Sequence, residues 1–212
     1  MEYNGKIDVL SVRPMYVESN LSKMKKYGRA PPKSEIIPGR KAALKILRNI
    51  DDFNKYNSTR NLPRINTTRL SAHLKFGTVS CREAYVAFKK KLSSSNDLIK
   101  QLYWRDFYLS IQYYYPDLKK SNTRDKMNKI KWNSSSKNLK AWQEGKTGVP
   151  LVDAGMREMN ATGFMHNRVR MVVATFLIFN LGIDWRKGEK YFSKKLIDAS
   201  TLKYENTFIE KE

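Results

Sequence analysis

The stretch Thr162-Gly-Phe-Met-His-Asn-Arg-Val-Arg-Met171 is the part of the sequence that decides the expected fold. From the end of this stretch onward, apolar residues recur at helical spacing and predict one buried helix face, formed by Val169, Val172, Val173, Phe176 and Leu177. Asn167, Arg168 and Arg170 then lie at the start of this helix, where exposed backbone N–H groups already favour anions. The sequence therefore predicts a helix start that suits phosphate groups.

The composition indicates a globular protein with a polyanionic partner. Of the 212 residues, 41% are hydrophobic, which is enough for a real core. The 41 basic and 20 acidic residues give a formal net charge of +21, and self-repulsion on this scale favours a partner such as nucleic acid. A genome with biased composition, rich in Lys, Asn and Ile, is the alternative explanation, and charge alone does not separate the two.

Cysteine usage and hydropathy suggest where the protein resides. Cys81 is the only cysteine, which excludes an intrachain disulfide and fits a reducing compartment. The longest apolar stretch, residues 171–183, is interrupted by Asn180 and is too short to cross a bilayer. The N-terminus lacks the apolar core of a secretion signal. We expect a soluble intracellular protein that is not secreted, has no membrane partner and, with two histidines and one cysteine, holds no metal.

Periodicity and punctuation predict an all-α architecture. Residues 1–38 are typical of an extended, partly disordered arm or linker, residues 39–204 of one helical domain, and residues 205–212 of a solvated tail. Ser80-Cys-Arg-Glu83 has the form of a capping box and predicts a helix to about Leu92. No alternating run has the length of a convincing strand.

Further helices are expected before and after this one. The pattern turns helical from Pro38-Gly39, a second helix should run from Asn96-Asp97 to a point before Pro116, and residues 153–159 resemble a short helix. The polar, basic segment 121–140 is expected to be mainly loop with short helical pieces.

The run Thr67-Thr-Arg-Leu-Ser71 places three hydroxyls and a guanidinium within five residues. Hydroxyls and backbone amides that lead into a helix can hold a diphosphate without a glycine-rich loop. An ordinary cap and turn is the alternative interpretation of this run.

The run Gln101-Leu-Tyr-Trp-Arg-Asp-Phe-Tyr108 is the second group that could carry chemistry. At helical spacing Gln101, Trp104, Arg105 and Tyr108 share one face, so an indole, an amide and a cation can converge on one cavity. Aromatic faces stack on flipped bases with about 1–3 kcal/mol per base. The alternative is that Trp104 and Phe107 are core residues.

These motifs, in this order, resemble the FAD-binding helical domain of the DNA photolyase and cryptochrome family. Residues 67–71 resemble the family's Thr-Ser-Arg-Leu-Ser, residues 101–108 its Glu-Leu-Ile-Trp-Arg-Glu-Phe-Tyr, and residues 142–150 its Trp-x-x-Gly-x-Thr-Gly-x-Pro. The similarity covers roughly residues 38–198. It implies light-dependent repair of cyclobutane pyrimidine dimers in DNA by electron transfer from reduced FAD. Asn167 and Met171 indicate the class I dimer type, because the family's (6-4) enzymes have histidines there.

The resemblance also implies a role for individual residues. Those expected to contact FAD are Tyr56, Thr67, Thr68, Arg69, Leu70, Ser71, Asn167, Arg170 and Asp198. Those expected to contact DNA are Arg60, Gln101, Trp104, Arg105, Tyr108, Asn167, Arg168, Arg170 and Met171. Trp132 and Trp185 occupy positions of the family's electron-transfer chain, and Gln101 is expected beside the lesion. His166 is interpreted as a structural or DNA-facing neighbour rather than a general base.

The sequence departs from the family pattern at several points. Gln101 stands where bacterial dimer photolyases have a glutamate, so the group beside the lesion is a neutral amide. The family's α/β antenna domain has no counterpart before residue 38, and no antenna chromophore is expected. After Asp198 the match stops: Ser200 replaces an acid and Tyr204 replaces an asparagine near the flavin. We therefore expect a truncated domain in which FAD binding is weakened or lost. A second polypeptide that supplies the missing segments is a candidate partner of this domain.

Three functions stay open at this point. The chain could be a truncated photolyase, a catalytically inactive, flavin-free DNA-binding remnant of one, or a cryptochrome-like light sensor. Light-dependent loss of dimers would favour the first, and salt-dependent DNA binding without flavin would favour the second.

Overall fold

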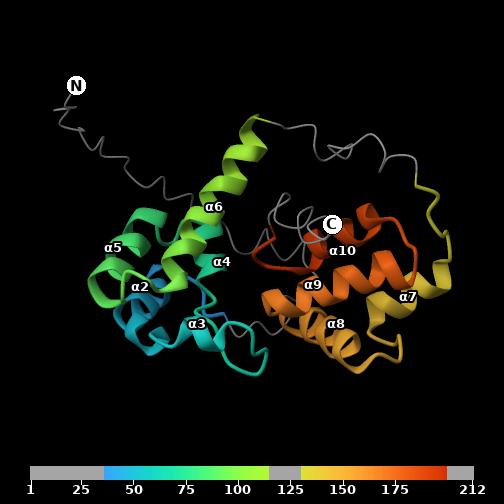
Figure 1. Cartoon of the computed structure of the whole chain (residues 1–212), viewed down its shortest axis with the longest axis horizontal. Helices are drawn as coiled ribbons and strands as arrows, with labels where there is room; N and C mark the ends of the chain where they lie inside the picture. Colours follow the sequence, from blue (N-terminus) through green and yellow to red (C-terminus); the bar gives the residue numbers. More distant parts are fainter. Residues whose placement is uncertain (1–35, 115–129, 200–212) are drawn as a thin grey trace, which may run out of the picture. The chain divides into compact units, whose positions relative to one another are not determined.

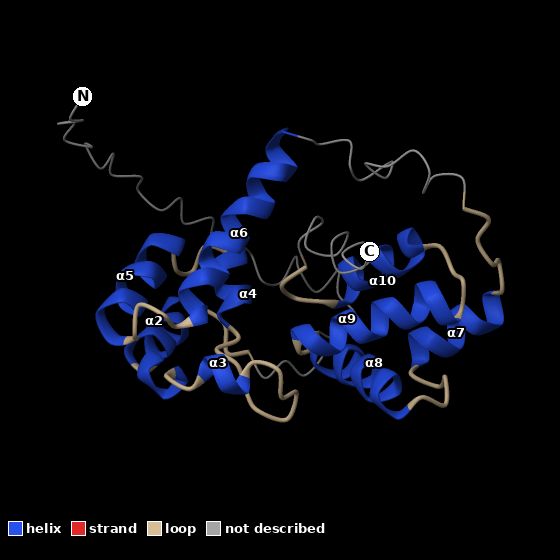
Figure 2. Cartoon of the chain, viewed as in Figure 1, coloured by secondary structure: helices blue, strands red, loops and turns tan. Residues whose placement is uncertain are grey.

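The computed structural model describes residues 36–114 and 130–199, which form helices joined by loops (Figure 1). The helices of the described residues are α2 (Arg40–Arg48), η1 (Ile50–Phe53), α3 (Tyr56–Thr59), α4 (Leu70–Lys75), α5 (Cys81–Lys91), α6 (Asp97–Tyr114), α7 (Ser136–Glu144), α8 (Pro150–Thr162), α9 (Asn167–Thr175), the π-helical turn η4 (Phe176–Asn180) and α10 (Trp185–Lys195). Figure 2 shows no strand in this part of the chain, and Asn133 and Ile183 form an isolated parallel bridge. The predicted all-α architecture is confirmed.

Other expectations fall partly outside the described residues. Most of the expected arm and the whole expected tail lie there, as do Ser200 and Tyr204. The proposed domain boundaries therefore stay predictions. In the described part of the chain, no helix combines the length and apolarity that a bilayer span needs.

The helices α2, α4, α5 and α6 share one hydrophobic core, built on residues such as Ala43, Leu70 and Phe88. The predicted capping box opens α5, because the Glu83 N–H donates to Ser80 Oγ at 3.1 Å and the Ser80 N–H donates to Glu83 Oε2 at 2.9 Å. Arg40 Nη2 lies 2.6 Å from Glu83 Oε1. The carboxylate that caps α5 therefore also ties α5 to the start of α2.

Helix α6 is buried only near its beginning. The Asn96 side chain accepts from the Leu98 N–H at 3.0 Å and so caps the first turn. The buried residues of α6 are Leu98, Ile99 and Leu102, whereas its later aromatic residues are exposed or half-buried. The helix thus anchors one end in the core and presents aromatic side chains along the remainder.

The helices α7, α8, α9 and α10 build a second core around Trp142, which is fully buried. Its indole N–H donates to the Val173 carbonyl at 3.0 Å, and its ring stacks on Phe192 with 5.7 Å between centroids. Gly155 of α8 faces Val169 of α9 so closely that a Cβ atom would lie 2.4 Å from Val169 Cγ1. A glycine is needed where these two helices meet.

Sequence signals did not locate the start of α7, and the expected bounds of α8 were wrong. Helix α7 begins at Ser136, inside the segment expected to be mainly loop, because Ser135 Oγ accepts from the Asn138 N–H at 3.2 Å. Helix α8 runs from Pro150 to Thr162 rather than over 153–159. Proline in the first turn and Gly163 with φ of 71° after the last turn are the signals that mark these ends.

The expected buried face of α9 was also partly wrong. Val169, Val173 and Leu177 are buried as predicted, but Val172 is 41% exposed and Phe176 is only partly buried. Arg170 is buried instead. The Arg170 side chain lies in the buried face because it has a buried ionic partner in Asp198. The helix is therefore oriented with Val172 towards solvent.

Candidate functional site

A buried ionic cluster joins three distant parts of the chain. Arg170 Nη2 of α9 lies 3.0 Å from Asp198 Oδ1, and the two side chains are 3% and 2% exposed. Ser71 of α4 donates its hydroxyl to Asp198 Oδ2 at 2.7 Å, and Arg170 Nε donates to the Met165 carbonyl at 2.7 Å. Three of the residues predicted to contact a flavin are thus brought together.

Phe164 lies next to this cluster, under two cations. The guanidinium carbon of Arg69 is 4.8 Å from the centroid of the Phe164 ring, and that of Arg170 is 5.5 Å from it. Arg69 has φ of 51°, the left-handed region that an L-residue adopts only under constraint. Phe164 did not appear among the expected site residues, although the run that decides the fold contains it.

The hydroxyl-rich run leads into α4 as expected. Thr68 Oγ1 accepts from the Leu70 N–H at 3.3 Å. The side chains of Thr67, Thr68 and Ser71 are half-buried and Leu70 is buried. The run therefore forms a turn without a side-chain cap at Arg69, the N-cap residue of α4, and it presents the Ser71 hydroxyl to the buried cluster.

Helix α9 begins with a histidine cap. His166 Nδ1 accepts from the Arg168 N–H at 3.2 Å, and the side chain is 5% exposed. Its Nε2 atom is buried with no hydrogen-bond partner among the described residues. Burial lowers the pKa of His166, and the Arg170 and Arg168 cations lower it further. The imidazole is therefore neutral at pH 7, and Asn167 follows it as an exposed residue.

A groove between α8 and α9 begins at Arg168. Arg168 Nε donates to Asn61 Oδ1 at 2.7 Å, and its Nη1 contacts Met171 Sδ at 3.5 Å. The groove has a volume of about 590 Å³. It is lined by Asn61, Val149, Val152, Arg168, Met171, Val172, Thr175, Phe176 and Asn180. Sequence reasoning identified Arg168 and Met171 as DNA contacts but missed the other lining residues.

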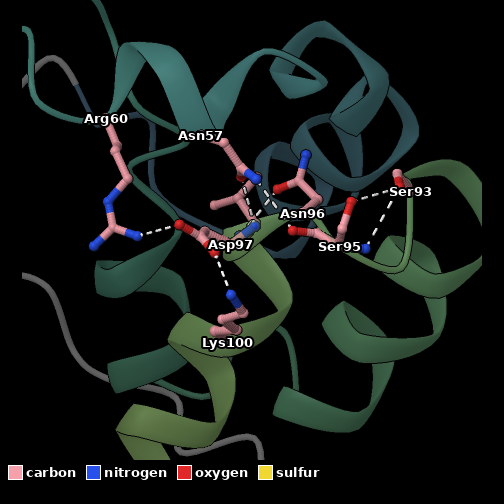
Figure 3. Close-up of polar contacts among 8 residues, drawn as sticks. Asn57, Arg60, Ser93, Ser95, Asn96, Asp97 and Lys100 are labelled. Carbon is pink, nitrogen blue, oxygen red and sulfur yellow. Dashed lines mark hydrogen bonds and ion pairs between the residues drawn. The ribbon is translucent and has the colours of Figure 1, made fainter.

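Asp97 joins two cations at the start of α6, as Figure 3 shows. Its Oδ2 lies 2.5 Å from Arg60 Nη1 and its Oδ1 lies 2.9 Å from Lys100 Nζ. Hydrogen bonds from Lys100 and Arg60 hold the pKa of Asp97 below its usual value. The guanidinium carbon of Arg60 lies 5.9 Å from the centroid of Tyr56, so these two expected site residues lie together.

An aromatic cluster follows on α6. Trp104 and Tyr108 stack with 5.8 Å between ring centroids and an interplanar angle of 25°, which fits the expected shared face. Trp104 is 50% exposed and Phe107 is 52% exposed, so the alternative that both are core residues was wrong. Gln101 and Arg105 are half-buried, and Arg105 Nη1 lies 3.4 Å from Asp106 Oδ1.

The tryptophans expected to carry electrons belong to one core. Trp185 is 5% exposed at the start of α10, and the partly buried Trp132 packs against the same cluster. Asp184 Oδ1 accepts from the Arg186 N–H at 2.9 Å and caps the helix that holds Trp185. Their electron-transfer role stays a prediction. In the described residues, no group of three or more His, Cys, Asp or Glu side chains is placed to hold a metal ion.

Comparison with known proteins gives the family. Residues 98–206 match the model of the FAD binding domain of DNA photolyase, so the expectation that the family match stops at Asp198 was wrong. The chain belongs to this family. It is 37% identical over 197 residues to a deoxyribodipyrimidine photo-lyase of Halobacterium salinarum, and the matched region covers 86% of this chain and 41% of the relative. It is 40% identical over 169 residues to that of Escherichia coli, covering 75% of this chain and 36% of the relative.

Solved photolyase structures share the fold. A class III photolyase from Agrobacterium tumefaciens matches with a TM-score of 0.76 and 37% identity, over 81% of this chain and 37% of the other. An archaeal photolyase from Sulfolobus tokodaii, solved with two FAD molecules, matches with a TM-score of 0.78 and 38% identity, over 89% and 42% of the two chains. The chain therefore spans about two fifths of the length of these photolyases.

Within this photolyase domain, most of the expected site residues lie in four places. The first is the buried Arg170–Asp198 pair with its hydroxyl neighbours. The second is the groove that begins at Arg168, the third is the Asp97 cluster, and the fourth is the exposed aromatic cluster of α6. The first site provides buried hydrogen-bond donors and acceptors, and the other three provide cations and apolar side chains.

Proposed function

We propose that this chain is the flavin- and DNA-binding part of a photolyase that reverses cyclobutane pyrimidine dimers in DNA with light. The observation that carries the proposal is the buried Arg170–Asp198 pair with the Ser71 hydroxyl on its carboxylate. A buried ion pair contributes little net stability, and this one lies in a chain that matches the FAD binding domain of DNA photolyase, which supports a binding role for the pair. The matched relatives are named deoxyribodipyrimidine photo-lyases, which supports the reaction.

The residues present fit FAD. A diphosphate needs hydroxyl and cationic donors, which half-buried Thr67, Thr68 and Arg69 provide. A flavin ring edge carries both carbonyl and N–H groups, and Arg170 and Asp198 supply a donor and an acceptor side by side. When bound in its reduced form, FAD supplies the light-driven electron that splits the dimer.

The chain's own residues would bind and orient the damaged DNA. Trp104 presents an exposed indole on which a flipped base can stack, and Arg168 presents a half-buried cation for a phosphate. Met171 adds an apolar surface beside Arg168, and Gln101 adds a neutral amide on the same helix as Trp104. Arg60, Arg105 and Tyr108 would extend this DNA contact, and Trp132 and Trp185 would conduct electrons through the second core.

The first experiment is to incubate the purified chain with FAD, remove free ligand and record the absorbance. Flavin binding is expected to be detectable but weak, in line with the departures from the family pattern at Ser200 and Tyr204, and Arg170→Met should reduce it further. A repair assay on an oligonucleotide that contains one cyclobutane dimer follows, with the light and dark reactions compared. We expect light-dependent loss of dimers that Trp104→Ala and Asn167→Ala weaken and that Tyr113→Ala, an exposed aromatic of the same helix, leaves unchanged.

Two results would contradict this function. Repair that is equal in light and dark excludes photochemistry. A colourless protein that binds DNA in a salt-dependent manner, and that no flavin concentration converts into a repair enzyme, supports a flavin-free DNA-binding remnant instead.

A further inference from the structure

The groove that begins at Arg168 extends beyond the expected DNA contacts. From Arg168 to Asn180 its lining residues follow one another along α9 and η4. The α-helical part, from Arg168 to Thr175, spans about 10 Å at 1.5 Å per residue, and η4 extends this wall further. Val149 and Val152 of α8 form the facing wall. The groove therefore has room for more than the guanidinium and thioether at its start.

Charge favours an anionic group at the start of the groove. Arg168 is half-buried, and among the described residues its polar partners are Asn61 Oδ1 at 2.7 Å and Met171 Sδ at 3.5 Å, neither of them a carboxylate. By contrast, Arg60 and Arg170 are neutralised by Asp97 and Asp198. A partly desolvated cation without a counter-ion gains from a charge-assisted hydrogen bond to an anion.

The walls of the groove favour a flat apolar body. Val172 is 41% exposed and Val149 is 37% exposed, and Phe176 offers an aromatic ring that is only partly buried. The far part adds the Asn180 amide, which is exposed and can pair with a base edge as donor and acceptor. An anionic group, a flat apolar body and a hydrogen-bonding edge together describe a nucleotide.

We propose that this groove is a nucleotide subsite that holds one undamaged nucleotide next to the lesion, with its phosphate at Arg168, its base against Val172 and Phe176, and the base edge at Asn180. The subsite rests on the proposed function for the identity of the strand as DNA. The net charge of +21 and the continuity of the groove with Arg168 and Met171 favour a nucleic acid over an uncharged apolar ligand. Binding of this nucleotide needs neither flavin nor light.

The test measures binding of the full chain to a fluorescent, undamaged single-stranded thymidine octamer by anisotropy, in the dark and without FAD, over a range of salt concentrations. Phe176→Ala should weaken binding roughly fivefold or more without changing the salt dependence, because it removes a base contact. Arg168→Gln should lower the slope of log K against log salt by about 0.7, because it removes one phosphate contact. Phe179→Ala, which removes a 65% exposed ring of the same turn outside the groove, should bind as the unaltered chain does.

Phe176 packs against the second core, so a second variant is needed in case Phe176→Ala unfolds. Asn180 is exposed, and Asn180→Ala should fold normally and still weaken binding to the octamer. The subsite is excluded if Asn180→Ala and a folded Phe176→Ala bind as tightly as the unaltered chain, or if Phe179→Ala weakens binding equally. Light-dependent repair separates the two proposals. If the chain repairs dimers but the groove variants bind the octamer as tightly as the unaltered chain, the subsite alone is overturned. If the groove variants bind the octamer more weakly but the chain shows no repair, the photolyase function alone is overturned.

Discussion

The guanidinium of Arg170 and the carboxylate of Asp198 meet at 3.0 Å inside the protein, although 28 residues separate them in the chain. One belongs to α9 and the other follows α10, and Ser71 of α4 binds the same carboxylate. The pair thus holds the helices that supply the expected flavin contacts. Because two buried charges lose hydration, their attraction yields little net stability, while loss of one partner leaves the other charge uncompensated.

Asp198→Asn is expected to destabilise the fold by about 3 kcal/mol, because it leaves the Arg170 charge buried without its carboxylate. The double variant Arg170→Gln with Asp198→Asn removes both charges and should recover more than half of this loss. Urea unfolding followed by circular dichroism measures the free energy of unfolding for each protein. Single losses that simply add in the double variant would show that the two side chains do not interact energetically.

Gly155→Ala should destabilise the α8–α9 contact by about 1–3 kcal/mol, because the added methyl overpacks a filled site. The new Cβ would lie 2.4 Å from Val169 Cγ1 and 3.2 Å from Val173 Cγ2. Val169→Ala removes the nearer methyl groups, so adding it to Gly155→Ala should cost less than the sum of the two changes. Thermal unfolding of the four proteins checks this, and a Gly155→Ala chain as stable as the original would contradict the close approach.

Local signals allowed the boundaries of some elements to be predicted from the sequence. Ser80 and Glu83 lie three residues apart, and their reciprocal bonds form within one turn, so the start of α5 was predictable. The same kind of signal, Ser135 before α7 and Pro150 in the first turn of α8, was present but not used, so the start of α7 was not predicted and the start of α8 was misplaced.

The parts of the site that sequence reasoning missed depend on distant contacts. Helical periodicity predicts that the charged Arg170 is exposed, because its ionic partner Asp198 lies outside the helix in which the periodicity is evaluated. Burial of Arg170 moves the buried face and leaves Val172 and Phe176 to line the groove. Motif resemblance, in contrast, named both members of the ion pair, since a motif records contacts that span the chain.

Asp97→Asn is expected to strengthen binding to undamaged duplex DNA. The carboxylate holds Arg60 at 2.5 Å and Lys100 at 2.9 Å, so its removal frees a cation for phosphate. The slope of log K against log salt should steepen by up to about 0.9, the value for one added phosphate contact. Glu144→Gln on α7 makes the same charge change at a different exposed ion pair. An equal gain in Glu144→Gln would show that net charge alone is responsible.

Stability should fall as the pH drops below about 6.5, because His166 is buried and neutral. Its folded-state pKa is lowered from 6.5 by burial and by the Arg170 and Arg168 cations. The unfolded chain therefore binds the proton first, and the stability that is complete above pH 6.5 is lost as the pH falls towards the folded-state pKa. Protonation also removes the Nδ1 acceptor that caps the Arg168 N–H.

His166→Asn keeps a side-chain acceptor at this cap and removes the titration. Urea unfolding at pH 7.5 and pH 5.5 should show a smaller loss on acidification for this variant than for the original chain. The remaining pH dependence includes His73, whose pKa burial also lowers. If the variant lost as much stability as the original chain between these pH values, the His166 contribution would be excluded.

Arg69→Gly should give a more stable protein than Arg69→Ala, by about 1 kcal/mol, because glycine adopts positive φ without the clash of a Cβ atom. Arg69 has φ of 51°, and both replacements equally remove its guanidinium from the Phe164 ring, 4.8 Å away. At Lys89, an exposed helical position of α5, the same two replacements should rank in the opposite order, since alanine is the better helix former. Chemical denaturation of the four variants measures both differences, and an Arg69→Ala variant that is more stable than Arg69→Gly would show that the backbone at Arg69 is not under left-handed constraint.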